Sequence, residues 1–141
     1  MRVVVDTNVF VSAALKDKSL PSIALHLAAQ RGVLLKSAAT EAQLLDVIAR
    51  PYLAPLIASA TSDWFKQLLA AAELISITEK IAACRDSTDD KFLELAISGH
   101  ADFILTGDDD LLVLNPFRGI PIVNPATFVQ GASRYRCPPS E

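Results

Sequence analysis

The chain has 141 residues, 51% of them apolar and 21% charged, a length and composition typical of one globular domain with its own core. No apolar run reaches the roughly 20 residues that a membrane-spanning helix needs, and the first ten residues, which contain Asp6 and Asn8, do not have the pattern of a signal peptide. The net charge of −3 argues against a protein that grips nucleic acid through a general surplus of basic residues, so that metal ions would have to supply positive charge at any phosphate site.

The first half of the chain alternates short apolar runs with amphipathic segments. A β-branched run at residues 2–5 predicts a buried strand that ends at Asp6, and residues 6–15 continue as a helix or an irregular turn. The next expected elements are a helix from Ser19 to Gly32, a strand at 33–36, and helices over about 40–49 and 62–72.

The second half continues the same alternation. The expected elements are a strand at 74–77, a helix from about Asp90 to Ser98 that Gly99 ends, strands at 103–106 and 120–123, and a short last helix that begins at Asn124-Pro125.

Short apolar strands between helices predict an α/β fold, a three-layer α/β/α arrangement around a central, mostly parallel sheet of about five strands. The chain contains no internal repeat and no linker, and we expect one domain over residues 1–130 and a flexible tail over 131–141. Two distant cysteines, Cys84 and Cys137, make no disulfide framework, so a cytoplasmic location is expected.

Acidic residues fall where three of these segments approach one end of the sheet. Asp6 follows the first strand, and the run Asp108, Asp109 and Asp110 follows the fourth strand across Thr106 and Gly107. A third group precedes or begins the helix that leads into the fourth strand: Asp86, Asp89 and Asp90. Ligands of open parallel sheets bind beyond the carboxyl ends of the strands, so these acids predict a site there.

A divalent cation would make such a cluster tolerable, because neighbouring carboxylates otherwise repel and raise one another's pKa values. Mg²⁺ and Mn²⁺ prefer oxygen ligands and assist phosphodiester hydrolysis. Considered alone, Asp89 or Asp90 could have only the role of stabilising the N-terminus of a helix through the helix dipole. The run at 108–110 could likewise be a solvated turn. Asp6, directly after a Val-Val-Val run, is harder to explain without a partner.

Three stretches resemble PIN-domain ribonucleases. They are VVVDTNVFVSAAL near the start, RDSTDDKFLELAISGHADFILTGDDDLL in the second half, and IVNPATF after the fifth strand. The resemblance covers about residues 2–129 and is strongest to the branch described as toxins of toxin–antitoxin pairs.

The resemblance implies a Mg²⁺ or Mn²⁺ site of three or four acids and endonucleolytic cleavage of RNA. It also implies a cognate antitoxin protein and a homodimer. Carried over by position, the metal-binding and catalytic acids are Asp6, Asp108 and one of Asp89 and Asp90, with Glu41 as a further catalytic candidate. The polar residues expected around them are Thr7, Asn8, Gln43, Asp86, Thr106 and Asp110.

The sequence departs from the family at one position. The resemblance implies a glutamate on the helix after the second strand, where this chain has Gln43; the nearest acid, Glu41, would point to nearly the opposite side of a regular helix. Gln43 could serve as a neutral ligand, Glu41 could replace it from an irregular first turn, or the site could be weakened. Alternatively, Gln43 could be only the partner of Thr40 in a capping box.

Other functions fit the residues less well. A phosphatase with an aspartyl nucleophile would need a second acid two residues after Asp6, where Asn8 stands. A phospho-accepting signalling domain would need an Asp after the third strand, which is followed by Thr78-Glu79-Lys80. The remaining alternative is a catalytically weakened PIN-like module that binds RNA or a partner protein, and Gln43 keeps it open.

Overall fold

A parallel five-stranded sheet with helices on both faces organises the chain in a computed structural model, which describes residues 1–131. The predicted flexible tail therefore lies outside the described residues except for Gly131. The strand order is β3-β2-β1-β4-β5, and every pairing is parallel. The strands are β1 (Arg2–Val5), β2 (Val33–Lys36), β3 (Glu73–Leu74), β4 (Phe103–Leu105) and β5 (Ile122–Val123). This architecture confirms the predicted α/β/α fold.

Seven α-helices and two short 3-10 helices connect the strands of the described region. They are α1 (Thr7–Leu15), α2 (Leu20–Arg31), α3 (Ala38–Ile48), η1 (Ala54–Leu56), α4 (Ser59–Ala71), η2 (Ser87–Asp89), α5 (Asp90–Ser98), α6 (Asp109–Leu112) and α7 (Pro125–Gln130). None of these helices is both long and apolar enough to cross a bilayer.

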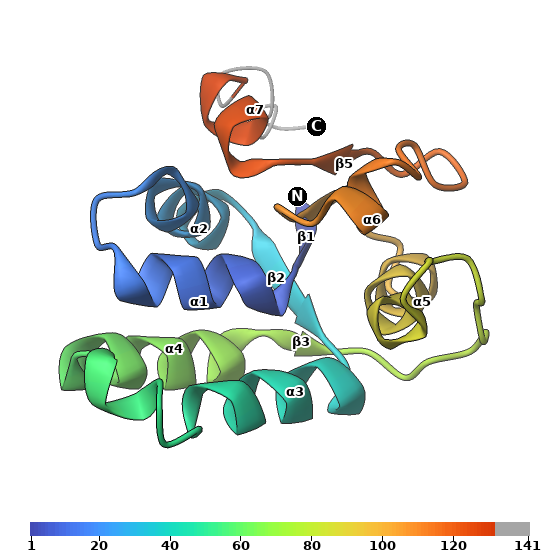
Figure 1. Cartoon of the computed structure of the whole chain (residues 1–141). Helices are drawn as coiled ribbons and strands as arrows, with labels where there is room; N and C mark the ends of the chain where they lie inside the picture. The colour runs from blue at the N-terminus through green and yellow to red at the C-terminus, as the bar shows by residue number, and fades with distance from the viewer. Residues whose placement is uncertain (132–141) are drawn as a thin grey trace.

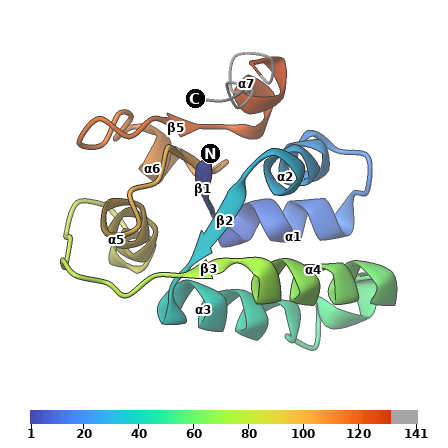
Figure 2. The ribbon, with the colours of Figure 1, turned by 180° about the vertical axis from the view of Figure 1, so that it is seen from behind.

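Two apolar layers cover the sheet, because successive side chains of a strand point to opposite faces. Val3 and Val5 of β1 pack with apolar residues of α1, α2, α3, α4 and α7. Val4, between them, faces α5 and α6 on the other side. Figures 1 and 2 show this division from opposite directions, with α1 to α4 on one side of the strands and α5 on the other.

Polar caps define where the helices begin. The Ser37 hydroxyl accepts from the backbone N–H of Thr40, and the Thr40 hydroxyl accepts from the backbone N–H of Ser37, which forms a capping box at the start of α3. The capping box suggested between Thr40 and Gln43 is therefore wrong, because the helix begins two residues earlier than expected. Gln43 is free of that structural role.

The third strand is shorter than predicted and begins one residue earlier. Its ladder extends only as far as the bond from Ile75 N to the carbonyl of Lys36. Beyond that point, side chains of α5 take over the backbone donors of the segment. The short helix α6 is not among the elements expected from the sequence, and Asp108 caps its start.

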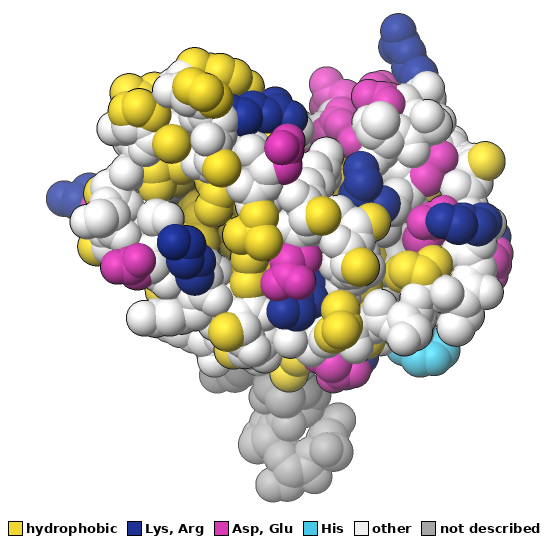
Figure 3. All heavy atoms as spheres, turned by 90° about the horizontal axis from the view of Figure 1, so that it is seen from below, with side chains coloured by type: hydrophobic (Ala, Val, Ile, Leu, Met, Phe, Trp, Pro, Cys, Tyr) yellow, Lys and Arg dark blue, Asp and Glu magenta, His cyan; other side chains and the backbone are white. Residues whose placement is uncertain are grey.

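Three of the exposed large apolar side chains belong to α3 and the segment that follows it. Leu45, Tyr52 and Leu56 are all exposed. Seen from below, hydrophobic side chains concentrate toward one side of this face, while charged side chains of both signs are scattered over the rest (Figure 3).

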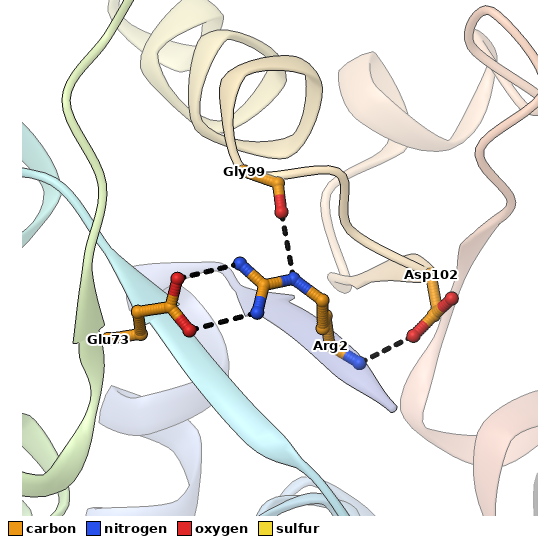
Figure 4. Close-up of polar contacts among 4 residues, drawn as sticks. All are labelled: Arg2, Glu73, Gly99 and Asp102. Atoms are coloured by element: carbon orange, nitrogen blue, oxygen red, sulfur yellow. Dashed lines mark hydrogen bonds and ion pairs between the residues drawn. The ribbon is translucent and has the colours of Figure 1, made fainter.

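A polar clamp holds the amino-terminal end of the sheet. The guanidinium of Arg2 makes two parallel hydrogen bonds with the Glu73 carboxylate, at 2.8 and 2.9 Å, and a third with the carbonyl of Gly99 at 2.9 Å. The backbone N–H of Arg2 donates to Asp102 at 2.6 Å. Figure 4 shows how one residue thus joins β1, β3 and the turn between α5 and β4.

The buried layer under α5 gives a direct test of this packing. Leu93 is 0% exposed, whereas Leu56 is 64% exposed. We expect Leu93→Ala to lower the free energy of unfolding by about 2–5 kcal/mol, because it removes apolar contacts and leaves a cavity. Leu56→Ala, the matched control, should change it by about 0.5 kcal/mol or less. Urea denaturation measures both, and equal losses would contradict the packing.

Candidate metal centre

Asp6 occupies a buried position where β1 passes into α1. The residue is 2% exposed, and its backbone N–H donates to the carbonyl of Leu105 on the neighbouring strand β4. Its carboxylate accepts from the Asn8 backbone N–H at 3.2 Å and so caps α1. The Asp6 side chain is therefore fixed at the carboxyl end of the sheet.

Thr106 joins Asp6 to the acids that follow β4. This residue is 0% exposed, and its hydroxyl donates to the Asp6 carboxylate at 2.7 Å while accepting from the backbone N–H of Asp108 at 3.0 Å. Asp108 in turn accepts from the backbone N–H of Asp110 at 2.9 Å. One hydroxyl thus sets the relation between the ends of β1 and β4.

Asp89 comes to the same place from the start of α5. One carboxylate oxygen from each of Asp89, Asp108 and Asp110 lies within 4.8 Å of the others. Before it, Asp86 caps η2 by accepting from the backbone N–H and the hydroxyl of Thr88, at 3.0 and 2.7 Å. The carboxylate of Asp86 is occupied locally.

Burial, together with neighbouring charges, disfavours ionisation of two of these acids. Burial raises the pKa of Asp6, and the Asp108 charge adds to this, although the Thr106 hydroxyl and the Asn8 amide act in the opposite direction. Burial and the adjacent Asp108 carboxyl raise the pKa of Asp89 to about 7, with further contributions from the charges of Asp6 and Asp86. Hydrogen bonds from Thr88 instead hold the pKa of Asp86 below its usual value.

Asp90 is turned toward the backbone instead of toward this cluster. It is 7% exposed, and one of its oxygens accepts from the backbone N–H groups of Ala83 and Cys84 at 3.1 and 2.8 Å. Burial disfavours its charge, but these bonds outweigh burial and lower its pKa. Of the two adjacent acids, the structure brings Asp89 to Asp108 and Asp110.

Helix α3 brings an amide, and no free carboxylate, to Thr7 beside Asp6. The buried Thr7 hydroxyl donates to the side-chain carbonyl of Gln43 at 3.0 Å. Glu41 instead forms an ion pair with Lys36 at 2.9 Å.

A hollow of about 490 Å³ opens beside the acids. It is lined by Asn8, Val9, Ser12, Pro21, Gly107, Asp108, Asp109, Asp110 and Pro125. The acids of the lining are Asp108 and the first residues of α6, and the other lining residues come from α1, α2, Gly107 and the start of α7. The Asp108 carboxylate therefore borders a space large enough to admit a ligand group.

The chain belongs to the PIN-domain family, whose profile matches residues 2–110. Among curated proteins, it is 29% identical over 120 residues to the uncharacterized protein MJ1680 of Methanocaldococcus jannaschii, covering 81% of this chain and 75% of that protein. The family predicted from the three sequence stretches is confirmed.

Two solved structures share the fold. VapBC2 from Rickettsia felis, crystallised with a DNA fragment from its promoter, superposes with a TM-score of 0.59 at 19% identity, over 88% of this chain and 98% of that one. PAE2754 from Pyrobaculum aerophilum superposes with a TM-score of 0.55 at 19% identity, over 94% and 90%. At this identity the likeness concerns the fold alone.

Sequence reasoning missed three features of the site. The sequence places Asp110 among the polar residues expected around the metal-binding acids, whereas the structure brings its carboxylate close to those of Asp89 and Asp108. Two side-chain contacts, Thr7 with Gln43 and Lys36 with Glu41, join separate elements, and no local sequence pattern predicts them. The capping role of Asp108 was readable, because an Asp directly before an Asp-Asp-Leu-Leu stretch is a favoured N-cap.

The raised pKa values predict an unusual pH dependence of the metal-free protein. An acid whose pKa is higher in the folded state stabilises the fold while protonated, and this contribution is lost as the pH rises through the folded value. For Asp89 the loss spans roughly pH 4 to 7, and Asp6 acts in the same direction. In EDTA, we expect the free energy of unfolding to fall between roughly pH 4 and 7 more steeply in the wild type than in Asp89→Asn. Parallel curves in urea denaturation would contradict this account of the cluster.

Proposed function

We propose that this protein is a Mg²⁺- or Mn²⁺-dependent endoribonuclease that hydrolyses RNA phosphodiesters. The observation that carries the proposal is the convergence of Asp89, Asp108 and Asp110 within 4.8 Å beside the buried Asp6. Membership of the PIN-domain family supports it. A buried strand-end acid and a half-buried carboxylate trio are costly to charge, so the arrangement is explained best by a cation.

The donor set fits Mg²⁺ or Mn²⁺. Asp89, Asp108 and Asp110 each offer a carboxylate oxygen to the cluster, and hard cations prefer such ligands. Asp6, Asp89 and Asp108 would hold the metal, with Asp110 beside them. A bound cation would supply the positive charge that the scissile phosphate and the attacking water require.

The protein's own residues contribute orientation. Thr106 holds the Asp6 carboxylate and the backbone of Asp108, so two of the ligands are fixed before a metal arrives. Thr7, which follows Asp6 in the chain, donates its hydroxyl to Gln43 and so links the start of α1 to α3. The hollow of about 490 Å³ beside Asp108 leaves room for part of a nucleic acid strand.

We further infer that the protein is the toxin of a cytoplasmic toxin–antitoxin pair. The family resemblance supports an antitoxin partner, and the acidic hollow suits a peptide that presents a basic side chain. The exposed apolar side chains of Leu45, Tyr52 and Leu56 are candidates for a homodimer contact, because exposed apolar surface can mark protein interfaces.

RNA cleavage in Mn²⁺ tests the activity. We expect the wild type to cut a mixed single-stranded RNA panel, and EDTA to abolish cutting. Asp6→Asn should lower the rate at least about 100-fold, because a ligand charge is lost while an acceptor for Thr106 remains.

The exposed Asp63 on α4 provides a control, and Asp63→Asn should cut at the wild-type rate. Wild-type activity in Asp6→Asn, or no cutting by folded wild-type protein, would overturn the nuclease proposal.

A weakened PIN-like module that binds RNA or a partner protein is the second candidate. The observation that favours it is the absence of a free carboxylate from α3, where Gln43 contacts Thr7 and Glu41 is paired with Lys36. Such a module would bind metal weakly, because one charged ligand fewer faces the cation.

Gln43→Glu discriminates between the two. If the site is weakened, the added carboxylate should raise Mn²⁺ affinity about ten-fold and increase the cutting rate. Gln67→Glu adds the same charge at an exposed position on α4 and should change neither. Calorimetric titration with Mn²⁺ measures the affinities, and equal behaviour of the two variants would rule out a place for Gln43 at the metal.

A further inference from the structure

Beyond Ile75, whose backbone N–H still bonds to β2, the segment up to residue 84 runs along α5. Side chains of the helix accept hydrogen bonds from four of its backbone N–H groups. The bonds run from Thr78 N to Ser98 Oγ (3.0 Å), from Ile81 N to Glu94 Oε2 (3.0 Å), and from Ala83 N and Cys84 N to Asp90 Oδ1 (3.1 and 2.8 Å).

The three acceptors form one stripe of the helix. Asp90, Glu94 and Ser98 are four residues apart, which places them on the same side of an α-helix. The opposite side is buried in the core against the sheet, through Phe92, Leu93, Leu95 and Ala96. Helix α5 is therefore held from two sides, and Asp90 makes the last of these attachments at its N-terminus.

The attachment made by Asp90 lies next to Asp89, whose carboxylate has to be held in place against repulsion. Asp89 is held near Asp108 and Asp110 although their charges repel it. The local bonds on the preceding side are the Asp86 cap on Thr88 and the turn from Asp89 N to the carbonyl of Asp86, at 3.0 Å. On the following side, two side chains tie the backbone down. The Lys91 ammonium donates to the carbonyl of Thr88, and the Asp90 carboxylate accepts two charge-assisted bonds from the backbone of residues 83 and 84.

We propose that Asp90 is a positioning residue: by binding the backbone of residues 83 and 84 it holds Asp89 toward Asp108 and Asp110, and it is not itself a metal ligand. This inference rests on the metal site of the proposed function. The carboxylate of Asp90 acts through Asp89, which is the residue that would touch the cation.

Mn²⁺ titration of the full chain by calorimetry tests the proposal with a pair of equal charge changes. Asp89→Asn and Asp90→Asn each remove one negative charge. Asn at 90 retains an oxygen that accepts from both backbone donors, so Asp90→Asn should keep its Mn²⁺ affinity within about three-fold, whereas Asp89→Asn should lose at least about ten-fold. Equal losses in the two variants would make Asp90 a ligand and overturn the proposal.

Two alanine variants separate positioning from general loosening. Asp90→Ala and Glu94→Ala both release the segment from α5, but only the first release lies beside Asp89. Asp90→Ala should weaken Mn²⁺ binding about ten-fold, while Glu94→Ala should leave the affinity unchanged at a comparable loss of thermal stability. Amide hydrogen exchange should show lost protection at 83 and 84 in Asp90→Ala alone. Equal Mn²⁺ affinities for the two alanine variants would also overturn the proposal.

The outcomes distinguish this inference from the nuclease proposal. Wild-type protein that binds Mn²⁺ and follows the expected order of affinities, but cuts no RNA, would uphold positioning and refute the activity. Wild-type protein that cuts RNA, while Asp90→Asn loses Mn²⁺ as Asp89→Asn does, would refute positioning alone. Absence of Mn²⁺ binding in the wild type would refute both.

Discussion

The hydrogen bond between Thr106 and Asp6 is the contact on which the acidic site depends. Both side chains are buried, and they come from neighbouring strands that are remote in sequence. A buried carboxylate without a partner would be costly, and the hydroxyl lowers that cost while its own oxygen accepts from the backbone of Asp108. The parallel pairing of β1 with β4 is what brings the two residues together.

The site works against the stability of the fold that carries it. Acids from the ends of two strands and from the start of α5 repel one another, and two of them have raised pKa values. The apolar layers on both faces of the sheet supply the compensating free energy, because Val3, Val4 and Leu105 are fully buried beneath the helices. A functional cluster that destabilises the fold is usually held by a rigid scaffold with many supporting contacts.

Most of the fold could be predicted from sequence because its signals are local. The valines at 3–5 announce a buried strand, and Ser19, Gly32 and Asn124 mark helix ends that the structure places within one residue of expectation. The approach of Asp6 to Asp108 follows from parallel topology alone. Hydrophobic periodicity could not decide between Asp89 and Asp90, because the answer depends on the direction of each side chain. It could not give the partner of Gln43 either, because that contact joins distant elements.

The Arg2 clamp gives the two ends of the sheet opposite responses to ionic strength. At the amino ends of the strands, Arg2 attracts Glu73 and Asp102; at the carboxyl ends, like charges push apart. Added monovalent salt weakens the attraction at one pole and relieves the repulsion at the other. Salt therefore acts in opposite directions at the two ends of the sheet, so probes of local stability at each end report what a global melting curve averages.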